Sequence, residues 1–279
     1  MLSLRYLKIW IGGAILLVLF VCGVAAPLIA PRDPSAQTLE DRLRPPRWVD
    51  NASSAYLLGT DNLGRDILSR IVYGSRISLL VGAATVIFAG LFGCTLGAIA
   101  GYFGSTADEV VSKISEIFLA FPFLLIAIAI MAFLGQGLGN LIMALMLSRW
   151  VQYCRVVRGE VLSIRERDFV TAAKALGGKD WYVLFRHVVP NTVASVTVIA
   201  TFSMAIVIIT EASLSFLGLG VPVHIPTWGS MLSEGRSYIN RAPWLTIFPG
   251  LAIFITVFGI NLLGDGLRDI LDPKLRRQR

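Results

Sequence analysis

Six apolar runs, each long enough to cross a lipid bilayer, constrain the fold of this chain more than any other feature. They cover residues 9–30, 78–102, 114–134, 138–157, 192–210 and 245–263. About 20 residues of α-helix span a hydrocarbon core of about 30 Å. Charged residues make up only 15% of the chain, whereas soluble domains carry about 25%. The sequence therefore predicts an all-α membrane protein with six transmembrane helices.

The first apolar run has two interpretations, a cleaved signal peptide or an uncleaved membrane helix. Residues 9–30 follow Arg5 and Lys8. The run is longer than the apolar core of a signal peptide, which has about 7–15 residues, and Pro27 lies next to the small residues at which cleavage would occur. The sequence favours an uncleaved helix with its N-terminus in the cytoplasm.

Basic residues support the same orientation. Sixteen of the 25 fall in segments predicted to face the cytoplasm and nine in segments predicted to face outward. Lys and Arg are enriched in cytoplasmic loops of membrane proteins, which explains the net charge of +7 without nucleic acid. Residues 269–279 are predicted to form a cytoplasmic basic tail that fixes the topology or contacts anionic lipid.

The polar loop after the first span ends in an amphipathic stretch. Its apolar face is Ile67, Leu68, Ile71 and Val72, and its polar face is Arg65, Asp66, Ser69 and Arg70. We expect an interfacial helix capped by Thr60 or Asp61 and ending near Gly74. The loop lacks the acids of a calcium-binding hand, so Asp61 and Asp66 are predicted to be solvated or capping residues.

Particular residues characterise the middle spans. The second span is rich in glycine and alanine, which let transmembrane helices pack backbone to backbone, so we expect it in the interior. Pro122 predicts a kink in the third span. Arg149, Gln152 and Arg155 indicate that the fourth span emerges into the cytoplasm or faces a wet cavity.

Residues 168–191, DFVTAAKALGGKDWYVLFRHVVPN, form a basic segment between apolar runs. Their spacing predicts two short amphipathic helices joined by a turn at Gly177-Gly178. The apolar stripes are Phe169, Ala172, Ala173 and Leu176, then Trp181, Leu184, Phe185 and Val188. Asp168 is placed to cap the first helix, and Pro190 lies where a following helix would begin. An alanine-rich face lets a partner protein approach closely, so we expect the segment to dock into a groove on a partner. The alternative is an ordinary helix-turn-helix that binds no partner.

This segment resembles the cytoplasmic coupling loop of permease subunits in binding-protein-dependent ABC importers, with the pattern E-A-A-(three)-G-(nine)-I-x-L-P. Four positions match, namely Ala172, Ala173, Gly177 and Pro190. Three differ, since the Glu, Ile and Leu are replaced by Thr171, His187 and Val189. The resemblance implies an ATPase-coupling site formed by Asp168, Phe169, Thr171, Ala172, Ala173, Leu176, Gly177 and Pro190.

Two further stretches, residues 59–79 and 211–232, resemble the dipeptide, oligopeptide and nickel (DppC/OppC/NikC-like) branch of these permeases. This implies the type I importer architecture in a bacterial inner membrane, with both termini cytoplasmic. The expected partners are a second, homologous DppB/OppB-like permease, two ATPase subunits that hold ATP and Mg²⁺, and an extracytoplasmic binding protein. The expected cargo is di- and oligopeptides. Nickel or metal chelates and glutathione are the alternative cargoes.

The resemblance also implies a division of the chain. Residues 1–77 would hold the first helix and the outer loop with its interfacial helix, residues 78–268 the permease core, and residues 269–279 the tail. Glu211 is expected on the outer pathway, where it would meet a substrate's amino group or a cation. Pairing with a neighbouring arginine, or a place at the membrane interface, is an equal alternative. His224 is predicted to be a surface residue.

No motif for catalysis is present. The chain lacks GxxxxGK[ST], HExxH, CxxC and a nucleophile elbow, so we expect no catalytic residue, cofactor or metal on it. The three cysteines lie within or at the ends of apolar runs and are expected to be small buried hydrophobes. A self-sufficient ion-coupled carrier would need ionisable residues in several spans. An integral-membrane enzyme would need a cluster of His, Asp, Glu or Cys, and the chain has two His.

Overall fold

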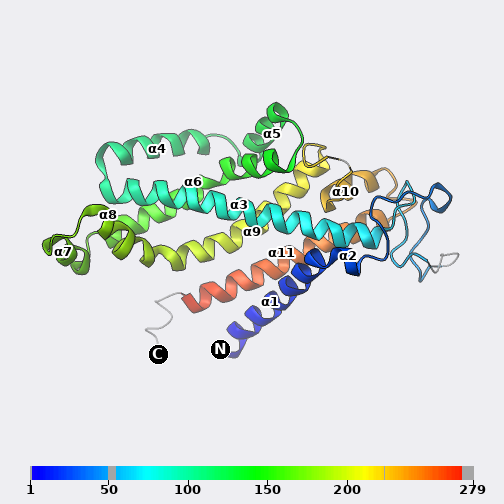
Figure 1. Ribbon diagram of the computed structural model, residues 1–279, viewed down its shortest axis with the longest axis horizontal. Helices are drawn as coiled ribbons and strands as arrows, with labels where there is room; N and C mark the ends of the chain where they lie inside the picture. Colours follow the sequence, from blue (N-terminus) through cyan, green and yellow to red (C-terminus); the bar gives the residue numbers. More distant parts are fainter. Residues whose placement is uncertain (1, 50–54, 223, 272–279) are drawn as a thin grey trace.

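The computed structural model describes residues 2–49, 55–222 and 224–271, and their regular elements are helices. The long helices run between a loop-rich end and an end that holds α7 and α8 (Figure 1). The bounds are α1 Leu2–Val24, α2 Ala26–Ile29, α3 Ile67–Phe103, α4 Ser105–Leu119, α5 Phe123–Leu134, α6 Leu138–Ile164, α7 Asp168–Ala175, α8 Asp180–Val183, α9 Val193–Phe216, α10 Trp228–Arg236 and α11 Trp244–Leu271. Shorter turns are η1 Leu39–Asp41, η2 Leu184–Val188 and η3 Val189–Thr192. From residue 272 onward, the predicted tail lies outside the described residues.

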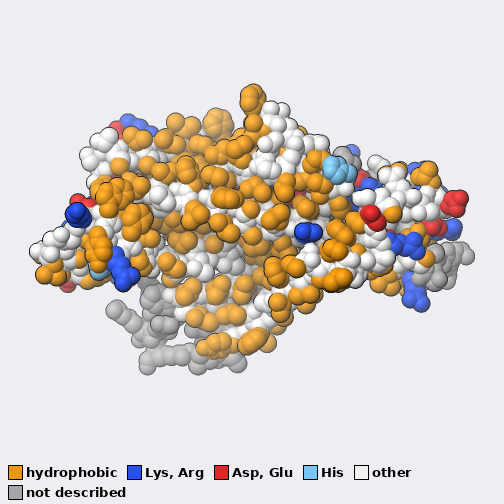
Figure 2. Space-filling model, in the orientation of Figure 1, with side chains coloured by type: hydrophobic (Ala, Val, Ile, Leu, Met, Phe, Trp, Pro, Cys, Tyr) orange, Lys and Arg blue, Asp and Glu red, His pale blue; other side chains and the backbone are white. Residues whose placement is uncertain are grey.

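Four helical stretches of the described chain are long and apolar enough to cross a membrane. They are α1, α3, the run Asp180–Phe216 that ends in α9, and α11. The bent pair α4 and α5 makes a fifth candidate if the two helices are counted as one span. Figure 2 shows a broad hydrophobic belt across the middle of the molecule, with most visible charged side chains near its two ends. The chain is therefore a multi-pass, all-helical membrane protein.

The prediction of a separate interfacial helix before the second span is wrong. Its residues begin α3, which continues without a break to Phe103. Asp66 caps α3 by accepting a hydrogen bond from the Ser69 N–H at 2.8 Å, so neither Thr60 nor Asp61 is the cap. Gly74 does not end the helix, which continues past it. Its missing side chain instead makes room for Trp228, whose Cδ1 would lie 2.9 Å from an added Cβ.

Other predicted boundaries shift where proline or glycine interrupts the backbone. Pro27 is in the separate short helix α2, and α1 ends at Val24, earlier than predicted. The kink predicted at Pro122 is confirmed as an 85° bend between α4 and α5. Glu211 does not end the fifth span, since α9 continues to Phe216.

Glycines bring α3 and α6 into backbone contact, which confirms the predicted interior packing of the second span. A Cβ on Gly93 would lie 2.3 Å from the Trp150 carbonyl oxygen. A Cβ on Gly97 would lie 2.3 Å from the Cys154 oxygen, which is inside van der Waals contact. Lipid supplies no hydrophobic drive between helices, so such close approach is a main source of their association.

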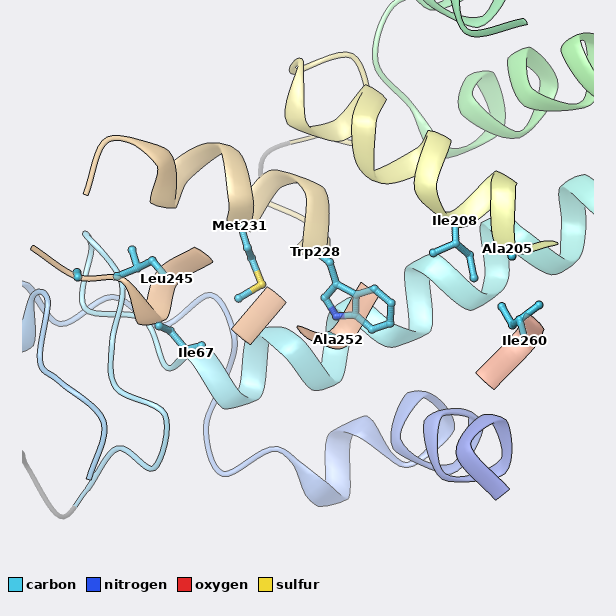
Figure 3. Close-up of a cluster of buried hydrophobic side chains, with 9 residues drawn as sticks. Ile67, Ala205, Ile208, Trp228, Met231, Leu245, Ala252 and Ile260 are labelled. Carbon is cyan, nitrogen blue, oxygen red and sulfur yellow. The ribbon is translucent and has the colours of Figure 1, made fainter. Parts of the chain in front are cut away.

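The tryptophan at the start of α10, in the connection between α9 and α11, is buried in a core that joins four helices. Trp228 is 1% exposed, and its indole N–H donates to the Ile71 carbonyl at 3.0 Å. Figure 3 shows Met231 of α10 near Ile67 at the start of α3 and Trp228 farther along α3, with Ile208 and Ile260 beyond it in the same cluster. The Trp228-Gly229 pair thus fastens the connection between α9 and α11 to the long helices.

A buried charge network missed by sequence reasoning lies at the loop-rich end. Arg65 Nε lies 2.6 Å from the Asp61 carboxylate, and Arg70 also pairs with Asp61. Both arginines contact Glu234 of α10, at 2.5 Å and 2.8 Å respectively. Asp61, Arg65, Asp66 and Arg70 are at most 7% exposed, so the solvated role predicted for Asp61 and Asp66 is wrong, whereas the capping role is confirmed for Asp66. Ion pairing replaces the lost water.

Gly97→Leu should destabilise the fold through the contact of α3 with α6. The added side chain must enter space that the Cys154 carbonyl occupies, and overpacking costs about 1–3 kcal/mol. Gly159→Leu is the control, because nothing lies within 4 Å of a Cβ at Gly159. The measurement is unfolding of the purified chain in detergent micelles, and equal stabilities of the two variants would contradict the close contact.

Asp61→Asn should also destabilise the fold, because it leaves Arg65 and Arg70 short of a buried counter-charge. Breaking a buried ion pair from one side costs about 3 kcal/mol. The control is Glu109→Gln, which removes an exposed pair with Lys113 and should change the free energy of unfolding by less than about 1 kcal/mol. The same unfolding measurement applies, and a loss no larger than the control's would refute the buried network.

Candidate functional site

Residues 168–191, called here the 168–191 loop, project beyond the long helices at the end opposite the loop-rich one (Figure 1). Helix α7 is followed by the turn at Gly177, by α8 and by the π-helical turn η2. The predicted pair of short helices is therefore present, although the second one is irregular. Pro190 lies in η3, directly before α9 begins at Val193.

One side of the 168–191 loop is anchored in the protein. Val170, Val183, Leu184 and Val188 are all 0% exposed. They pack with buried residues at the ends of α3 and α6, namely Ala98, Tyr102, Val157, Val161 and Ile164. Sequence reasoning missed Val170, which is the branched aliphatic residue of α7 and lies off the predicted stripe.

The other side of α7 is exposed and apolar. Phe169 is 41% and Leu176 89% exposed, and Ala172 lies between them on the surface. Ala173 is partly buried against the anchoring cluster, so the predicted stripe is split between the two sides. Thr171 is exposed. An apolar face that α7 does not bury in its own chain is available to a partner.

The stripe predicted for the second helix is split in the same way. Leu184 and Val188 face inward, whereas Trp181 and Phe185 are 54% and 51% exposed. The rings of Trp181 and Phe185 stack with centroids 6.0 Å apart, and Phe103 of α3 lies 4.9 Å from Trp181. Aromatic side chains of this kind are enriched at protein interfaces.

The prediction for the end of α7 at Gly177 is confirmed, whereas the prediction for its start at Asp168 is wrong. Asp168 is the first residue of α7 and not its cap, because Arg167 holds the cap position and gives no side-chain hydrogen bond. The Asp168 carboxylate still interacts favourably with the positive N-terminal end of the helix dipole. Gly177 ends the helix with φ +84°, a conformation that only glycine adopts without strain.

Charged and aromatic groups join α7 and α8 to the end of α3. Asp180 accepts a hydrogen bond from the Tyr102 hydroxyl at 3.0 Å and pairs with Lys174 at 3.4 Å. The Lys174 ammonium lies 4.6 Å from the centre of the Tyr102 ring. Burial acts to lower the pKa of Lys174, but its contacts with Tyr102 and Asp180 outweigh burial and raise that pKa. The loop is therefore held as one body with α3.

Glu211 lies apart from the 168–191 loop, in the interior of the protein. It is 0% exposed, and its carboxylate accepts hydrogen bonds from Ser78 at 3.1 Å and Ser215 at 2.8 Å. The alternative partner, an arginine, is not found for it among the described residues. Glu211 thus joins α9 to α3, and its role on an outer pathway stays a prediction. His224 is exposed, as predicted.

Comparison with known proteins identifies the family. Residues 93–277 match the family described as binding-protein-dependent transport system inner membrane component. Residues 9–46 match the N-terminal TM domain of oligopeptide transport permease C. The predicted resemblance to these permeases is confirmed.

Individual relatives cover nearly the whole chain. The di/tripeptide permease DppC of Pseudomonas aeruginosa is 43% identical over 95% of this chain and 88% of its own length. The oligopeptide permease OppC of Bacillus subtilis is 40% identical over 99% and 89%, and the glutathione permease GsiD of Pectobacterium atrosepticum is 43% identical over 95% and 86%. These relatives are transport components and not enzymes. The chain belongs to the inner membrane components of binding-protein-dependent transport systems.

Proposed function

We propose that this chain is one of two permease subunits of an ATP-driven importer of short peptides. A second, homologous DppB/OppB-like permease would complete the translocation pathway, two ATPase subunits would bind ATP and Mg²⁺, and an extracytoplasmic binding protein would deliver the cargo. The observation that carries the proposal is the two-sided 168–191 loop, whose buried side is fixed to the membrane helices while its apolar side is free. A partner that pushes on the free side moves the helices.

We propose six membrane spans with both termini in the cytoplasm. The spans are α1, α3, the bent pair α4 and α5, α6, α9 and α11. Helix α6 is less apolar in its second half but packs along α3. Two observations support a common side for the termini: Lys8 of α1 pairs with Asp269 of α11 at 3.4 Å, and the start of α1 and the end of α11 both lie toward the α7 end in Figure 1.

Peptides are the cargo that the relatives favour. Two of the relatives above are named as di/tripeptide and oligopeptide permeases and one as a glutathione permease, and glutathione is itself a short peptide. Nickel or metal chelates are the remaining alternative. The binding protein selects the cargo before the permease receives it, so a binding screen on that partner would distinguish these classes.

The proposed mechanism uses the loop as a lever. ATPase subunits that close on ATP would engage Phe169, Ala172 and Leu176 and move α7. The anchoring cluster would pass this motion to α3 and α6, and α9 follows because it continues directly from the loop. Separation of α3 from α9 would break the contact between Ser78 and Glu211 and expose that carboxylate to the pathway.

Ala172→Asp and Leu176→Asp should abolish peptide uptake while the chain stays folded. Both side chains are exposed, so the new charge costs the fold little, but it would be buried without a counter-charge in the contact with the ATPase. The control is Ala175→Asp, on the same helix but off the apolar face. The measurements are uptake in proteoliposomes and the amount of ATPase subunit that copurifies.

Uptake and ATPase binding like those of the control would refute the docking face.

The function itself is tested by reconstituting the chain alone and then with its partner subunits. We expect ATP-dependent uptake only in the complete set. Transport by the isolated chain along an ion gradient would instead establish the self-sufficient carrier.

A further inference from the structure

A cleft with a volume of about 640 Å³ opens between the ends of α6, α9 and α11 that lie toward the 168–191 loop. Both connections of that loop to the long helices contribute to the wall of the cleft: Arg167 directly precedes the loop, and Asn191 is its last residue. The wall also includes Glu160 and Ser195, on facing helices, and Arg268 of α11. The cleft is therefore distinct from the docking face on α7 but connected to it through the backbone.

Charges of both signs line this cleft without neutralising one another. Arg167 and Arg268 are exposed, and neither forms an ion pair with a carboxylate in the described part of the chain. One oxygen of Glu160 accepts a hydrogen bond from the Ser195 hydroxyl. The other, Oε2, is buried and has no partner among the described residues. A buried carboxylate oxygen without a donor is unfavourable, so the cleft is short of one hydrogen-bond donor.

A short peptide in its zwitterionic form has the complementary groups. Its α-ammonium group is a three-proton donor that suits Glu160, and its α-carboxylate suits a guanidinium. Two extended residues separate these groups by about 7 Å, which a cleft of this volume accommodates. The remaining wall combines the polar Ser163 with the apolar Val198 and Ile199, so it offers hydrogen bonds to the peptide backbone and no selective pocket for one side chain.

We propose that this cleft is an inner release site for short zwitterionic peptides, in which Glu160 receives the ammonium group and Arg167 and Arg268 receive the carboxylate. The inference rests on the proposed peptide-importer function and extends it to a defined place on this chain. Movement of α7 shifts Arg167 at one end of the loop and Asn191 at the other. The same motion that opens the pathway would therefore separate the groups that hold the peptide.

The test measures peptide binding to the assembled transporter, purified with its partner subunits and without the binding protein. The probes are radiolabelled dialanine, N-acetyl-dialanine and dialanine amide. Glu160→Gln should weaken dialanine binding about tenfold, the value of one charge-assisted hydrogen bond, and should leave N-acetyl-dialanine binding unchanged. Arg268→Gln should weaken dialanine binding similarly and leave dialanine amide binding unchanged.

The control is Lys113→Gln, an exposed change whose side chain pairs with Glu109 on α4, away from the cleft. It should bind all three probes like the wild type. Equal losses for all three probes in Glu160→Gln would show a general distortion and overturn the assignment. Loss of a partner subunit from the purified complex in either cleft variant would identify the cleft as a subunit interface and overturn it as well.

ATP hydrolysis separates failure of this inference from failure of the proposed function. If peptide-loaded binding protein stimulates hydrolysis but the complex binds no dialanine, the release site is wrong and the importer stands. If peptide-loaded binding protein gives no stimulation in the wild-type complex, the importer function fails and the release site fails with it.

Discussion

Backbone contact between α3 and α6 is the constraint on which the rest of the structure depends. At Gly93 and Gly97 the two helices approach too closely for any side chain to lie between them. This pair extends toward both ends of the molecule. Near one end α3 packs against Trp228 of α10, and at the other it contributes Tyr102 to the anchor of the 168–191 loop. Arg165 secures that second end by donating to the Gly101 carbonyl at 2.9 Å.

In the proposed importer, the 168–191 loop would transmit force to the membrane helices although it is not part of one. An isolated helix of the length of α7 is only marginally stable in water, so its order depends on Val170 and on the residues around it. The stiff connection is therefore on the buried side. The free side leaves its apolar groups exposed for the proposed ATPase partner, and Gly177 supplies a turn that few other residues would form without strain.

Periodicity and composition predicted much of this architecture from the sequence. The apolar runs, the glycine packing of the second span, the bend at Pro122 and the two short helices around Gly177 all depend on neighbouring residues, which a sequence displays directly. The continuity of α3 could not be predicted in this way. Gly74 is a packing position only because Trp228, far along the chain, lies against it.

The buried charges at the loop-rich end could not be predicted for the same reason, because they depend on residues far apart in the sequence. Arg70 and Glu234 are separated by 164 positions, and without that pairing an amphipathic stretch is naturally interpreted as a surface helix. The split of the apolar stripes on α7 and α8 was equally hidden, since spacing identifies a face but not what covers it. The paired ends of the 168–191 loop in one cleft are also visible only in three dimensions.

The network of Asp61, Arg65, Arg70 and Glu234 combines two cations with two anions that cancel at close range. Such an arrangement projects little field into the surrounding water, because opposite charges a few ångströms apart look neutral from a distance. This cluster therefore contributes little long-range attraction toward a dissolved molecule at the loop-rich end. Encounters there would depend on surface fit, and changes in ionic strength would alter their rate through this cluster only slightly.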